Sequence, residues 1–228
     1  AVLTSNGELL FAKAIVLGEG ETEVQALPIF CQQHWGLTPV ESGLSFVDAK
    51  GCGNYYPFVA LAEAFQITWY IFSDGEKDTK KGLKKLLKRT YNEDKELAEQ
   101  NNIFIISPEK DFEGMLLDDG YKDEIEKAIE QLKGEGYIDE FIRKFNHKPK
   151  GREQTPNICK SCNQHIFVDI ERIYDGEDGR LTALDDIMEK NKAQLGPVLA
   201  NCIIESEKPL PPLVVKLFDG IKKDICHV

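Results

Sequence analysis

The amino-acid sequence predicts an α/β protein in which a parallel sheet is flanked by helices and interrupted by a helical insertion. Two observations predict this class. Short apolar runs alternate with amphipathic stretches through the first half of the chain. Polar residues follow each of the first three runs at the point where it ends. The chain has 228 residues, of which 42% are hydrophobic, so it can bury a sizeable core.

The first half of the chain is predicted to hold four strands separated by three helices. The strands are short and rich in β-branched and aromatic side chains, and each expected helix has one apolar face. Strands that alternate with helices form βαβ units, so the four strands are expected to be parallel within one sheet. The expected strands are 11–17, 44–49, 67–72 and 103–107, and the expected helices are 21–35, 55–65 and 77–91.

The pattern changes after residue 108. Residues 109–146 are charged and predicted mostly helical, 146–157 are predicted to form a loop, and 165–174 are either a strand or the start of a helix. Three more helices are expected, with Pro197 at the first position of the second, where proline is favoured. Their ranges are 181–194, 197–206 and 213–225. The domain interpretation is a first part of the core at 1–108, a helical insertion at 109–165, and a completion of the core with C-terminal helices at 166–228.

Charge is distributed unevenly along the chain. The formal net charge is −11, and a uniform surface of that sign would repel nucleic acid. Residues 77–89 nevertheless carry seven basic residues and one aspartate. Their lysines share one face of the expected helix, which is either a solvated surface or a rail for DNA phosphates. The lysines of this face are Lys80, Lys81, Lys84, Lys85 and Lys88.

The remaining bulk features predict a cytoplasmic protein. No run approaches the roughly 18–20 apolar residues that a membrane span needs, and no signal-peptide pattern opens the chain. Six cysteines scattered through a chain of this size favour reduced thiols over a disulfide framework. Cys159 and Cys162 have the spacing of a zinc-binding pair, but two further ligands would be needed. A pair of free or redox-labile thiols is the alternative.

Acidic residues follow the first and third expected strands. Glu19 and Glu23 are four residues apart, so both face one side if a helix begins directly after the strand. Asp74, Glu76 and Asp78 follow the third strand, and neighbouring strands are about 4.8 Å apart. Carboxylates that converge there would suit Mg²⁺ or Mn²⁺, and two such ions can promote phosphodiester cleavage. The alternative is that these acids only complement helix dipoles.

A glycine turn follows the second expected strand. Gly51, Gly53 and Asn54 lead into a helix, and the N–H groups of such a turn can hold a phosphate. Lys50 beside the turn could contact the DNA backbone. The same Gly-Cys-Gly sequence is also typical of an ordinary tight turn, so both interpretations stay open.

Together these motifs resemble the Toprim domain, which topoisomerases, bacterial primases, small repair proteins and a group of nucleases share. Its pattern is a Glu after the first strand and a D-x-D after a later one. Glu19 matches the first part, and Asp74-Gly75-Glu76 matches the second with Glu as its last residue, so Glu76 or Asp78 is the second ligand. The stretches VLGEGETEVQALPIF and LSFVDAKGCGN are similar to the C-terminal Toprim region of OLD-family (overcoming lysogenisation defect) nucleases.

This resemblance implies a set of site residues. Glu19 and Glu23 would hold one or both of two divalent cations, Mg²⁺ or Mn²⁺, and Glu19 would also handle a proton. Lys192, in EKNKAQLGPVLANCI, is similar to the family's catalytic lysine and would stabilise charge on phosphorus. The further implied ligands are Asp74, one of Glu76 and Asp78, and the pair Asp111 and Glu113 that follows the fourth expected strand.

The same resemblance implies a DNA endonuclease or nickase that acts in phage defence. It also implies an N-terminal ABC-type ATPase domain on the same polypeptide, and a possible homo-oligomer in the full-length protein. ATP would act only through that domain, because the chain contains no G-x-x-x-x-G-K-[ST] pattern. Two alternatives remain: a Toprim domain in primer synthesis or RNA maturation, and a receiver-type regulatory domain with Asp74 as phosphoryl acceptor.

Overall fold

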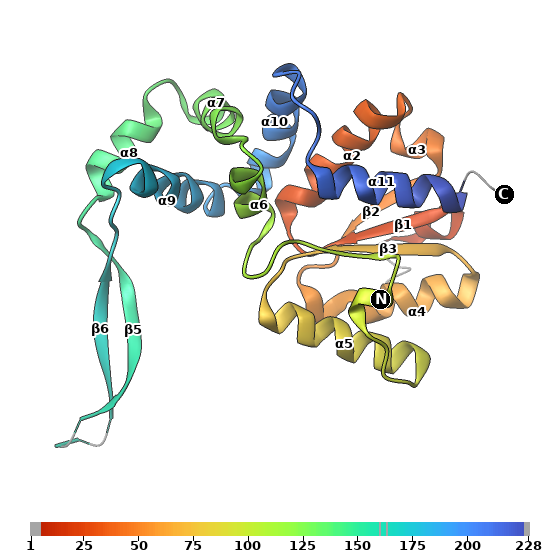
Figure 1. Ribbon diagram of the computed structural model, residues 1–228, viewed down its shortest axis with the longest axis horizontal. Helices are drawn as coiled ribbons and strands as arrows, with labels where there is room; N and C mark the ends of the chain where they lie inside the picture. Colours follow the sequence, from red (N-terminus) through yellow and green to blue (C-terminus); the bar gives the residue numbers. More distant parts are fainter. Residues whose placement is uncertain (1–5, 160, 163, 226–228) are drawn as a thin grey trace.

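The computed structural model describes residues 6–159, 161–162 and 164–225. Its centre is a four-stranded parallel sheet with the strand order β2-β1-β3-β4, which confirms the predicted α/β class. Helices cover both faces of this sheet, and a second group of helices beside it carries a projecting two-stranded hairpin (Figure 1). The strands of the sheet are β1 (Ala14–Gly18), β2 (Leu44–Asp48), β3 (Thr68–Ser73) and β4 (Ile103–Ile105).

Strand β1 lies between β2 and β3 and separates two apolar layers. Successive side chains of a strand point to opposite faces, so Ala14 and Val16 join one buried cluster and Ile15 and Leu17 join the other. Both faces are buried, which explains why the strand is a continuous apolar run in the sequence. The first layer includes residues of α2 (Glu21–Trp35) and α11 (Pro212–Ile225), and the second includes residues of α4 (Tyr55–Phe65) and α5 (Lys77–Tyr91).

The first apolar layer continues beyond the sheet into the second group of helices. Helix α10 packs against both α2 and α7. A Cβ atom placed on Gly196 of α10 would lie 2.6 Å from the carbonyl oxygen of Thr22 in α2, so the two helices touch through backbone atoms. This contact fixes α10 against the helix that follows β1. The group comprises α6 (Phe112–Asp118), α7 (Lys122–Lys133), α8 (Tyr137–Phe145), α9 (Gly176–Glu189) and α10 (Lys192–Glu205).

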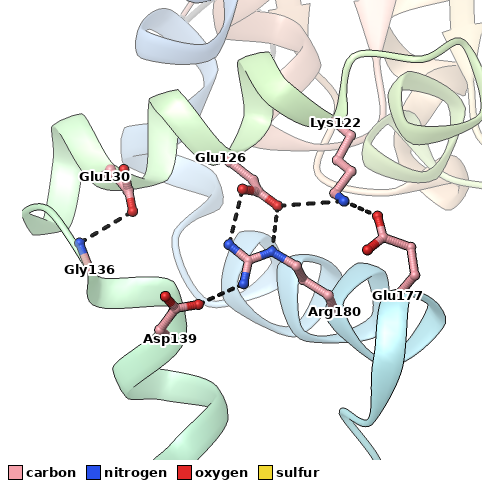
Figure 2. Close-up of polar contacts among 7 residues, drawn as sticks. All are labelled: Lys122, Glu126, Glu130, Gly136, Asp139, Glu177 and Arg180. Carbon is pink, nitrogen blue, oxygen red and sulfur yellow. Dashed lines mark hydrogen bonds and ion pairs between the residues drawn. The ribbon is translucent and has the colours of Figure 1, made fainter.

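Ion pairs hold α7, α8 and α9 together (Figure 2). The guanidinium of Arg180 in α9 binds both carboxylate oxygens of Glu126 in α7, at 2.7 and 3.0 Å, and Asp139 in α8 at 2.6 Å. Lys122 of α7 contacts Glu177 at the start of α9 and lies 3.9 Å from Glu126. A forked guanidinium–carboxylate contact restricts geometry more than a single bond does. The network therefore fixes the orientation of α9, which supplies side chains to the site described below.

The hairpin corrects the loop predicted for 146–157. Strand β5 (Pro149–Ile158) pairs antiparallel with β6 (His165–Glu171), so 165–174 begins as a strand. The sequence of β5 has no apolar alternation and contains two prolines, which sheets tolerate at an edge, at a strand start or at a bulge. Pro149 is the first residue, and Pro156 lies where the pairing register shifts. The interpreted boundary at 165/166 falls inside β6, directly after its first residue.

The helices α2, α4 and α5 begin and end at the predicted residues, and the sheet strands differ from prediction by a few residues at their ends. The expectation for Pro197 is wrong, because this residue lies inside α10. Packing of the flanking Leu195 and Leu199 in the core outweighs the hydrogen bond that a proline cannot donate.

In the described part of the chain, no helix has the length and apolar character to cross a membrane. Short elements complete the fold: η1 (Gly7–Phe11), α3 (Pro39–Ser42), η2 (Cys52–Asn54) and η3 (Leu97–Glu99).

Candidate functional site: an acidic cavity at the carboxyl edge of the sheet

Glu19 directly follows β1 and connects three other elements at the carboxyl edge of the sheet. Its carboxylate accepts hydrogen bonds from Ser73 Oγ at the end of β3, at 2.9 Å, and from Thr79 Oγ1 in α5, at 3.2 Å. It also accepts from the backbone N–H of Cys52 in η2, at 3.3 Å. Ser73 and Thr79 are buried, so these bonds fix the position of the Glu19 carboxylate.

Glu23 caps the helix that Glu19 precedes. Its Oε1 accepts hydrogen bonds from the backbone N–H of Glu19, at 2.9 Å, and of Gly20. The side chain is only 5% exposed. Burial raises the pKa of Glu23, and the backbone hydrogen bonds and the charge of Lys192 oppose that rise. Glu19 and Glu23 are therefore both held in place, Glu19 mainly by side-chain donors and Glu23 by the helix terminus.

A cavity of about 250 Å³ opens beside these residues. Its walls come from the loop after β3, from the start of α6, from α9 and from the first residue of α10. Six carboxyl groups and one ammonium group line it, which is a strong excess of negative charge. The lining residues are Asp74, Glu76, Asp111, Glu113, Asp185, Glu189 and Lys192.

Backbone contact between two loops brings Asp111 near Asp74. The N–H of Gly75 donates to the carbonyl oxygen of Lys110 at 2.8 Å, and the N–H of Glu109 donates to the carbonyl oxygen of Gly75 at 3.1 Å. A Cβ atom at Gly75 would lie 1.9 Å from the carbonyl oxygen of Ser107, so only glycine fits here. The glycine of the DGE motif thus has a structural role in assembling the cavity.

Asp74 makes no close ion pair among the described residues, although the charge of Lys192 lies within its electrostatic reach. No hydrogen bond to its carboxylate occurs within the described residues. Burial raises the pKa of Asp74 to about 8, with further contributions from the charges of Glu23, Glu19, Asp111 and Glu113. A carboxyl group so far from its ordinary pKa is typical of a functional site or of a missing counter-charge.

The pKa of Glu113 is also raised, but this carboxyl group, unlike that of Asp74, accepts a hydrogen bond. It is 2% exposed, and its Oε1 accepts a 2.7 Å hydrogen bond from Thr22 Oγ1 in α2. Burial raises the pKa of Glu113 to about 7, although the charge of Lys192 and the bond from Thr22 lower it. Asp111 uses its Oδ1 to cap α6 through the N–H of Gly114, at 2.9 Å.

Lys192 supplies the positive charge of the cavity. It is the first residue of α10, and its Nζ lies 3.8 Å from Oδ2 of Asp111. Burial opposes protonation of Lys192, but the charges of Glu113, Asp111, Asp74 and Glu23 outweigh it and raise its pKa. The side chain therefore stays an ammonium ion at neutral pH, which suits charge stabilisation and not proton abstraction.

The two sequence candidates for the second acidic ligand lie in different surroundings. Glu76 lines the cavity and precedes the first turn of α5. Asp78 is exposed in that first turn and pairs with Lys81 at 2.9 Å, and this hydrogen bond lowers the pKa of Asp78. The structure brings Glu76, and not Asp78, to the cavity.

The acidic groups fit hard divalent cations, although the side chains need rotation to bind one. Within residues 6–159, 161–162 and 164–225, no three His, Cys, Asp or Glu side chains already form a metal-binding group. The donor set nevertheless consists of carboxylate oxygens, the ligands that Mg²⁺ and Mn²⁺ prefer. The raised pKa values of Asp74 and Glu113 indicate a site where added positive charge would be favourable.

Sequence reasoning did not single out two cavity residues of α9, Asp185 and Glu189. They stand at i and i+4 on that helix, three residues or more before Lys192, and this spacing was the available signal. It also missed the partners of Glu19. Ser73 was visible as a polar residue at the end of an apolar run, whereas Thr79 was hidden in the lysine-rich helix.

The glycine turn after β2 closes over Glu19. The N–H of Gly51 donates to the backbone oxygen of Glu19 at 3.1 Å, and Asn54 Nδ2 donates to the backbone oxygen of Lys50 at 2.8 Å. With the bond from Cys52, two N–H groups of the turn are already used by Glu19. Phosphate binding by those groups would require Glu19 to move. Lys50, Gly53 and Asn54 are exposed.

The lysine face of α5 is partly neutralised. Lys81 pairs with Asp78, Lys84 lies 3.4 Å from Glu96, and Lys88 lies 3.1 Å from Asp94. For Lys80 and Lys85 the structure gives no ion pair within the part of the chain that it describes. Lys80 and Lys85 are therefore the lysines of the expected DNA-binding face that are best able to contact a phosphate.

Comparisons with known proteins agree with this architecture. Residues 10–75 match the family model described as "Overcoming lysogenization defect protein-like, TOPRIM domain". No curated protein sequence matches the chain. The C-terminal region of the Xanthomonas campestris pv. campestris OLD protein is similar in structure, with a TM-score of 0.65 and 18% identity over 97% of both chains. The C-terminal region of the Burkholderia pseudomallei OLD protein has a TM-score of 0.59 and 16% identity, over 94% of this chain and 99% of that one.

The structural likeness extends over nearly the whole chain, whereas the family model ends just after Asp74. The matched segment contains β1, β2 and β3 with Glu19, Glu23 and Asp74 at their carboxyl edge. Residues 10–75 are thus similar to an OLD-like Toprim domain, and the chain has the fold of the C-terminal region of OLD proteins.

Proposed function

We propose that this chain is a metal-dependent DNA endonuclease or nickase module that cleaves phosphodiester bonds with two divalent cations. One observation carries the proposal: a single cavity at the carboxyl edge of an OLD-like Toprim sheet gathers six carboxyl groups around one lysine. Ligands of open parallel sheets bind at that edge. The raised pKa of Asp74, to about 8, supports a site that is completed by cations.

In the proposed reaction, some residues of the chain would bind the cations and others would stabilise negative charge on the phosphate. Mg²⁺ or Mn²⁺, when bound, would supply positive charge to the attacking and leaving oxygens of an in-line displacement. Lys192 would place its ammonium group next to the phosphate and stabilise negative charge that develops there. The proposed cation holders are Glu19, Glu23, Asp74, Glu76, Asp111 and Glu113, with Asp185 and Glu189 as additions from α9.

Proton transfer in the proposed reaction is assigned to Asp74 and Glu19. Asp74 keeps a proton at pH 7 while cations are absent, because its pKa is raised to about 8. Cation binding would displace that proton. A proton role for Glu19 is compatible with its hydrogen bonds from Ser73 and Thr79, which hold the carboxylate in place beside Asp74's strand.

DNA is the proposed partner, and its backbone would lie across the basic face of α5. Lys80 and Lys85 are proposed as the main phosphate contacts, with Lys50 as an additional one. An N-terminal ABC-type ATPase domain is the second proposed partner, since the similar solved chains are described as C-terminal regions of OLD proteins. ATP would act only through such a domain. A role in phage defence, in the cytoplasm and in a homo-oligomeric full-length protein, belongs to the same proposal.

A plasmid-nicking assay tests the proposal. Supercoiled plasmid is incubated with the chain in Mg²⁺, in Mn²⁺ and in chelator, and the nicked form is quantified. We expect Glu19→Gln, Asp74→Asn and Lys192→Met each to lower the rate by roughly 10²–10³-fold, as loss of a charge-stabilising group does. Glu21→Gln is the matched control, because Glu21 is an exposed acid in the first turn of α2.

Equal rates in the three variants, the control and the wild type would place any nuclease activity elsewhere. The same assay separates the alternatives. A chain that acts only in primer synthesis or RNA maturation leaves the plasmid intact. A receiver-type domain would also leave it intact, and acetyl phosphate would label Asp74 in the wild type but not in Asp74→Asn.

A further inference from the structure

The hairpin β5–β6 projects from the second helical group and makes few contacts with the rest of the molecule (Figure 1). Every residue of β6 is exposed, and so is every residue of β5 except Thr155, which is half-buried. A two-stranded hairpin with both faces in water is marginally stable by itself, and both of its strands are open edges. Its exposure therefore indicates a surface that another molecule covers.

One face of the hairpin carries an apolar row. Ile166, Val168 and Ile170 alternate along β6 and so point to the same side. Their exposed fractions are 42%, 47% and 39%. Across the ladder, Val168 faces Glu153 and Ile170 faces Gly151, which provide no apolar cover. Three β-branched side chains in a row on a strand are a typical inter-strand packing surface.

The turn of the hairpin carries the C-x₂-C pair. Cys159 Sγ lies 3.0 Å from Ser161 Oγ. Hydrogen bonds from Ser161, and then from Cys162, lower the pKa of Cys159 to about 6. Cys162 is exposed. A pair of accessible thiols with this sequence spacing provides half of a tetrahedral Cys₄ zinc site.

The other half of such a site does not lie among the described residues of the same chain. No third His, Cys, Asp or Glu joins the pair to form a metal-binding group there. Cys31 and Cys202 are buried in the body, and Cys52 lies beside Glu19. Structural zinc takes four protein ligands, and Cys226 and His227 lie outside the described residues, so the remaining two ligands come either from these residues or from another molecule. A second copy offers an identical pair at an equally exposed tip.

We propose that the hairpin is a self-association arm, in which two copies share one Zn²⁺ held by Cys159 and Cys162 of each chain. The two arms would lie side by side about a two-fold axis along their length, so that the rows of Ile166, Val168 and Ile170 pack together. The four sulfurs bind as thiolates, and the protons still on them are released to water as zinc binds. The proposal is independent of the nuclease assignment, because neither cysteine lines the acidic cavity.

Zinc titration of the full chain under reducing conditions tests this proposal. The chain is stripped with chelator, and molecular mass by light scattering is followed with bound zinc by metal analysis. We expect the dimer mass to appear with zinc, at one ion per two chains. Co²⁺ in place of zinc should give the sulfur-to-metal absorption and the visible bands of a tetrahedral thiolate site, which carboxylates of the acidic cavity cannot produce.

Variants of the arm distinguish the two contacts. Cys159→Ser and Cys162→Ser should abolish the cobalt–thiolate absorption and leave the chain monomeric. Val168→Glu should weaken the zinc-dependent dimer by at least about tenfold, equivalent to ~1.4 kcal/mol, because it places charge in the apolar row. Ser161→Ala, in the same turn, is the control that keeps zinc and dimer. All four positions are in the exposed hairpin, and circular dichroism checks that each variant is folded.

Three outcomes would overturn the proposal. Zinc bound at one ion per monomer with no change of mass would mean that the site is complete within one chain. A dimer that forms equally well in chelator would mean that zinc does not bridge the copies. Failure to take up zinc or cobalt under reducing conditions, with a mass 2 Da lower after air oxidation, would identify the pair as a redox-labile dithiol instead.

Discussion

At the scale of single residues, Glu19 and Asp74 illustrate how two acids at one sheet edge differ in surroundings. Glu19 receives hydrogen bonds from a serine, a threonine and a backbone N–H, which hold its carboxylate in one position. Asp74 has no such donor among the described residues and faces other carboxylates, so its pKa is raised to about 8. Asp74 is therefore the residue whose state should respond most to cations and to pH.

Asp74→Asn should stabilise the cation-free protein at alkaline pH. The folded-state pKa of Asp74 is raised from 3.8 to about 8, so between these pH values the folded state holds a proton that the unfolded state has lost. The free energy of unfolding therefore falls as pH rises through this range. Asparagine cannot ionise. We expect Tm in chelator to increase by about 2–4 °C at pH 8, roughly 1 kcal/mol after allowing for partial solvent exposure, and to change little at pH 5.

The measurement is thermal unfolding of wild type and Asp74→Asn at both pH values, with and without Mn²⁺. Mn²⁺ should raise Tm of the wild type and should raise that of the variant much less. A variant that is equally stabilised at pH 5 and pH 8 would show that ionisation of Asp74 is not the cause. Asp78→Asn is the control, because Asp78 is exposed and paired with Lys81.

The second acidic ligand is predicted to be Glu76. Glu76→Gln should lower the nicking rate at limiting Mn²⁺ by about tenfold or more, the range reported for disturbed metal ligation. Asp78→Asn should leave that rate within about twofold, since its carboxylate points to Lys81 at 2.9 Å and is not part of the cavity wall. The check is a Mn²⁺ titration of nicking for both variants, and the reverse order of effects would assign the role to Asp78.

At the scale of elements, α9 connects the acidic cavity to the base of the hairpin. Asp186 is 3% exposed, and its carboxylate binds Lys150 Nζ of β5 at 2.6 Å and the hydroxyl of Tyr174. The neighbouring Asp185 and, one turn on, Glu189 line the cavity. Adjacent residues of one helix thus hold the arm on one side and contribute acids to the site on the other.

Asp186→Asn should destabilise the fold by roughly 1–3 kcal/mol, because it removes the charge of a buried carboxylate that pairs with the exposed Lys150 and with Arg172. Burial disfavours the ionised form of Asp186, but the bonds from Lys150 and Tyr174 outweigh it and lower its pKa. This contribution is therefore present above the ordinary value of 3.8 and lost as pH falls through the lower folded-state value. Urea unfolding at pH 7 measures the loss. Asp178→Asn, at an exposed position of the same helix, should cost less than about 1 kcal/mol, and equal losses would contradict the account.

Helix α5 should contact DNA through its unpaired lysines. Lys80→Glu with Lys85→Glu should weaken binding of a DNA duplex more than Lys84→Glu with Lys88→Glu, because the latter pair is already engaged by Glu96 and Asp94. Both double variants change the charge equally. Each lost phosphate contact should also reduce the slope of log K against log salt by about 0.9. Fluorescence anisotropy across a salt series measures both quantities, and identical slopes in the two variants would argue against a DNA rail.

The elements that sequence predicted well are those with strong local periodicity. Helix α5 carries lysines on one face and leucines on the other, so both of its ends could be predicted. Strand β1 consists of apolar residues, so its burial could be predicted from the sequence alone. Strand β5 has no such signal, since its pairing with β6 depends on residues that follow in the chain. Pro197 was misplaced because core packing of α10, and not local propensity, decides where that helix begins.

At the scale of the whole molecule, the chain leaves the sheet edge after Glu113 and returns to it at Asp185, after about a third of its length. Glu19 and Asp74 reach the edge directly from β1 and β3, so the strand order made them predictable. Asp185 and Glu189 reach it through α9, whose apolar face packs in the core and whose Arg180 forms ion pairs with α7 and α8 (Figure 2). No local pattern encodes that return, which is why these two acids required the structure.

The acidic cavity and the hairpin arm share no residues, so the nuclease proposal and the self-association proposal can be tested independently. Loss of the cysteine pair should leave nicking by a monomer measurable, and loss of Asp74 should leave zinc-dependent association intact. Both parts lie in a chain whose fold matches an OLD C-terminal region over 97% of its length. The arm forms a two-stranded sheet of its own, separate from the four strands of the central sheet.

The most direct test of the account is a crystal structure with Mn²⁺, at a concentration that supports nicking, with ions located by anomalous scattering. We predict two peaks about 3.5–4 Å apart in the acidic cavity, the separation typical of two-metal sites, with Asp74 and Glu19 turned toward them. A map without any anomalous peak in that cavity, while the same protein nicks DNA in solution, would contradict the claim that these carboxylates share divalent cations.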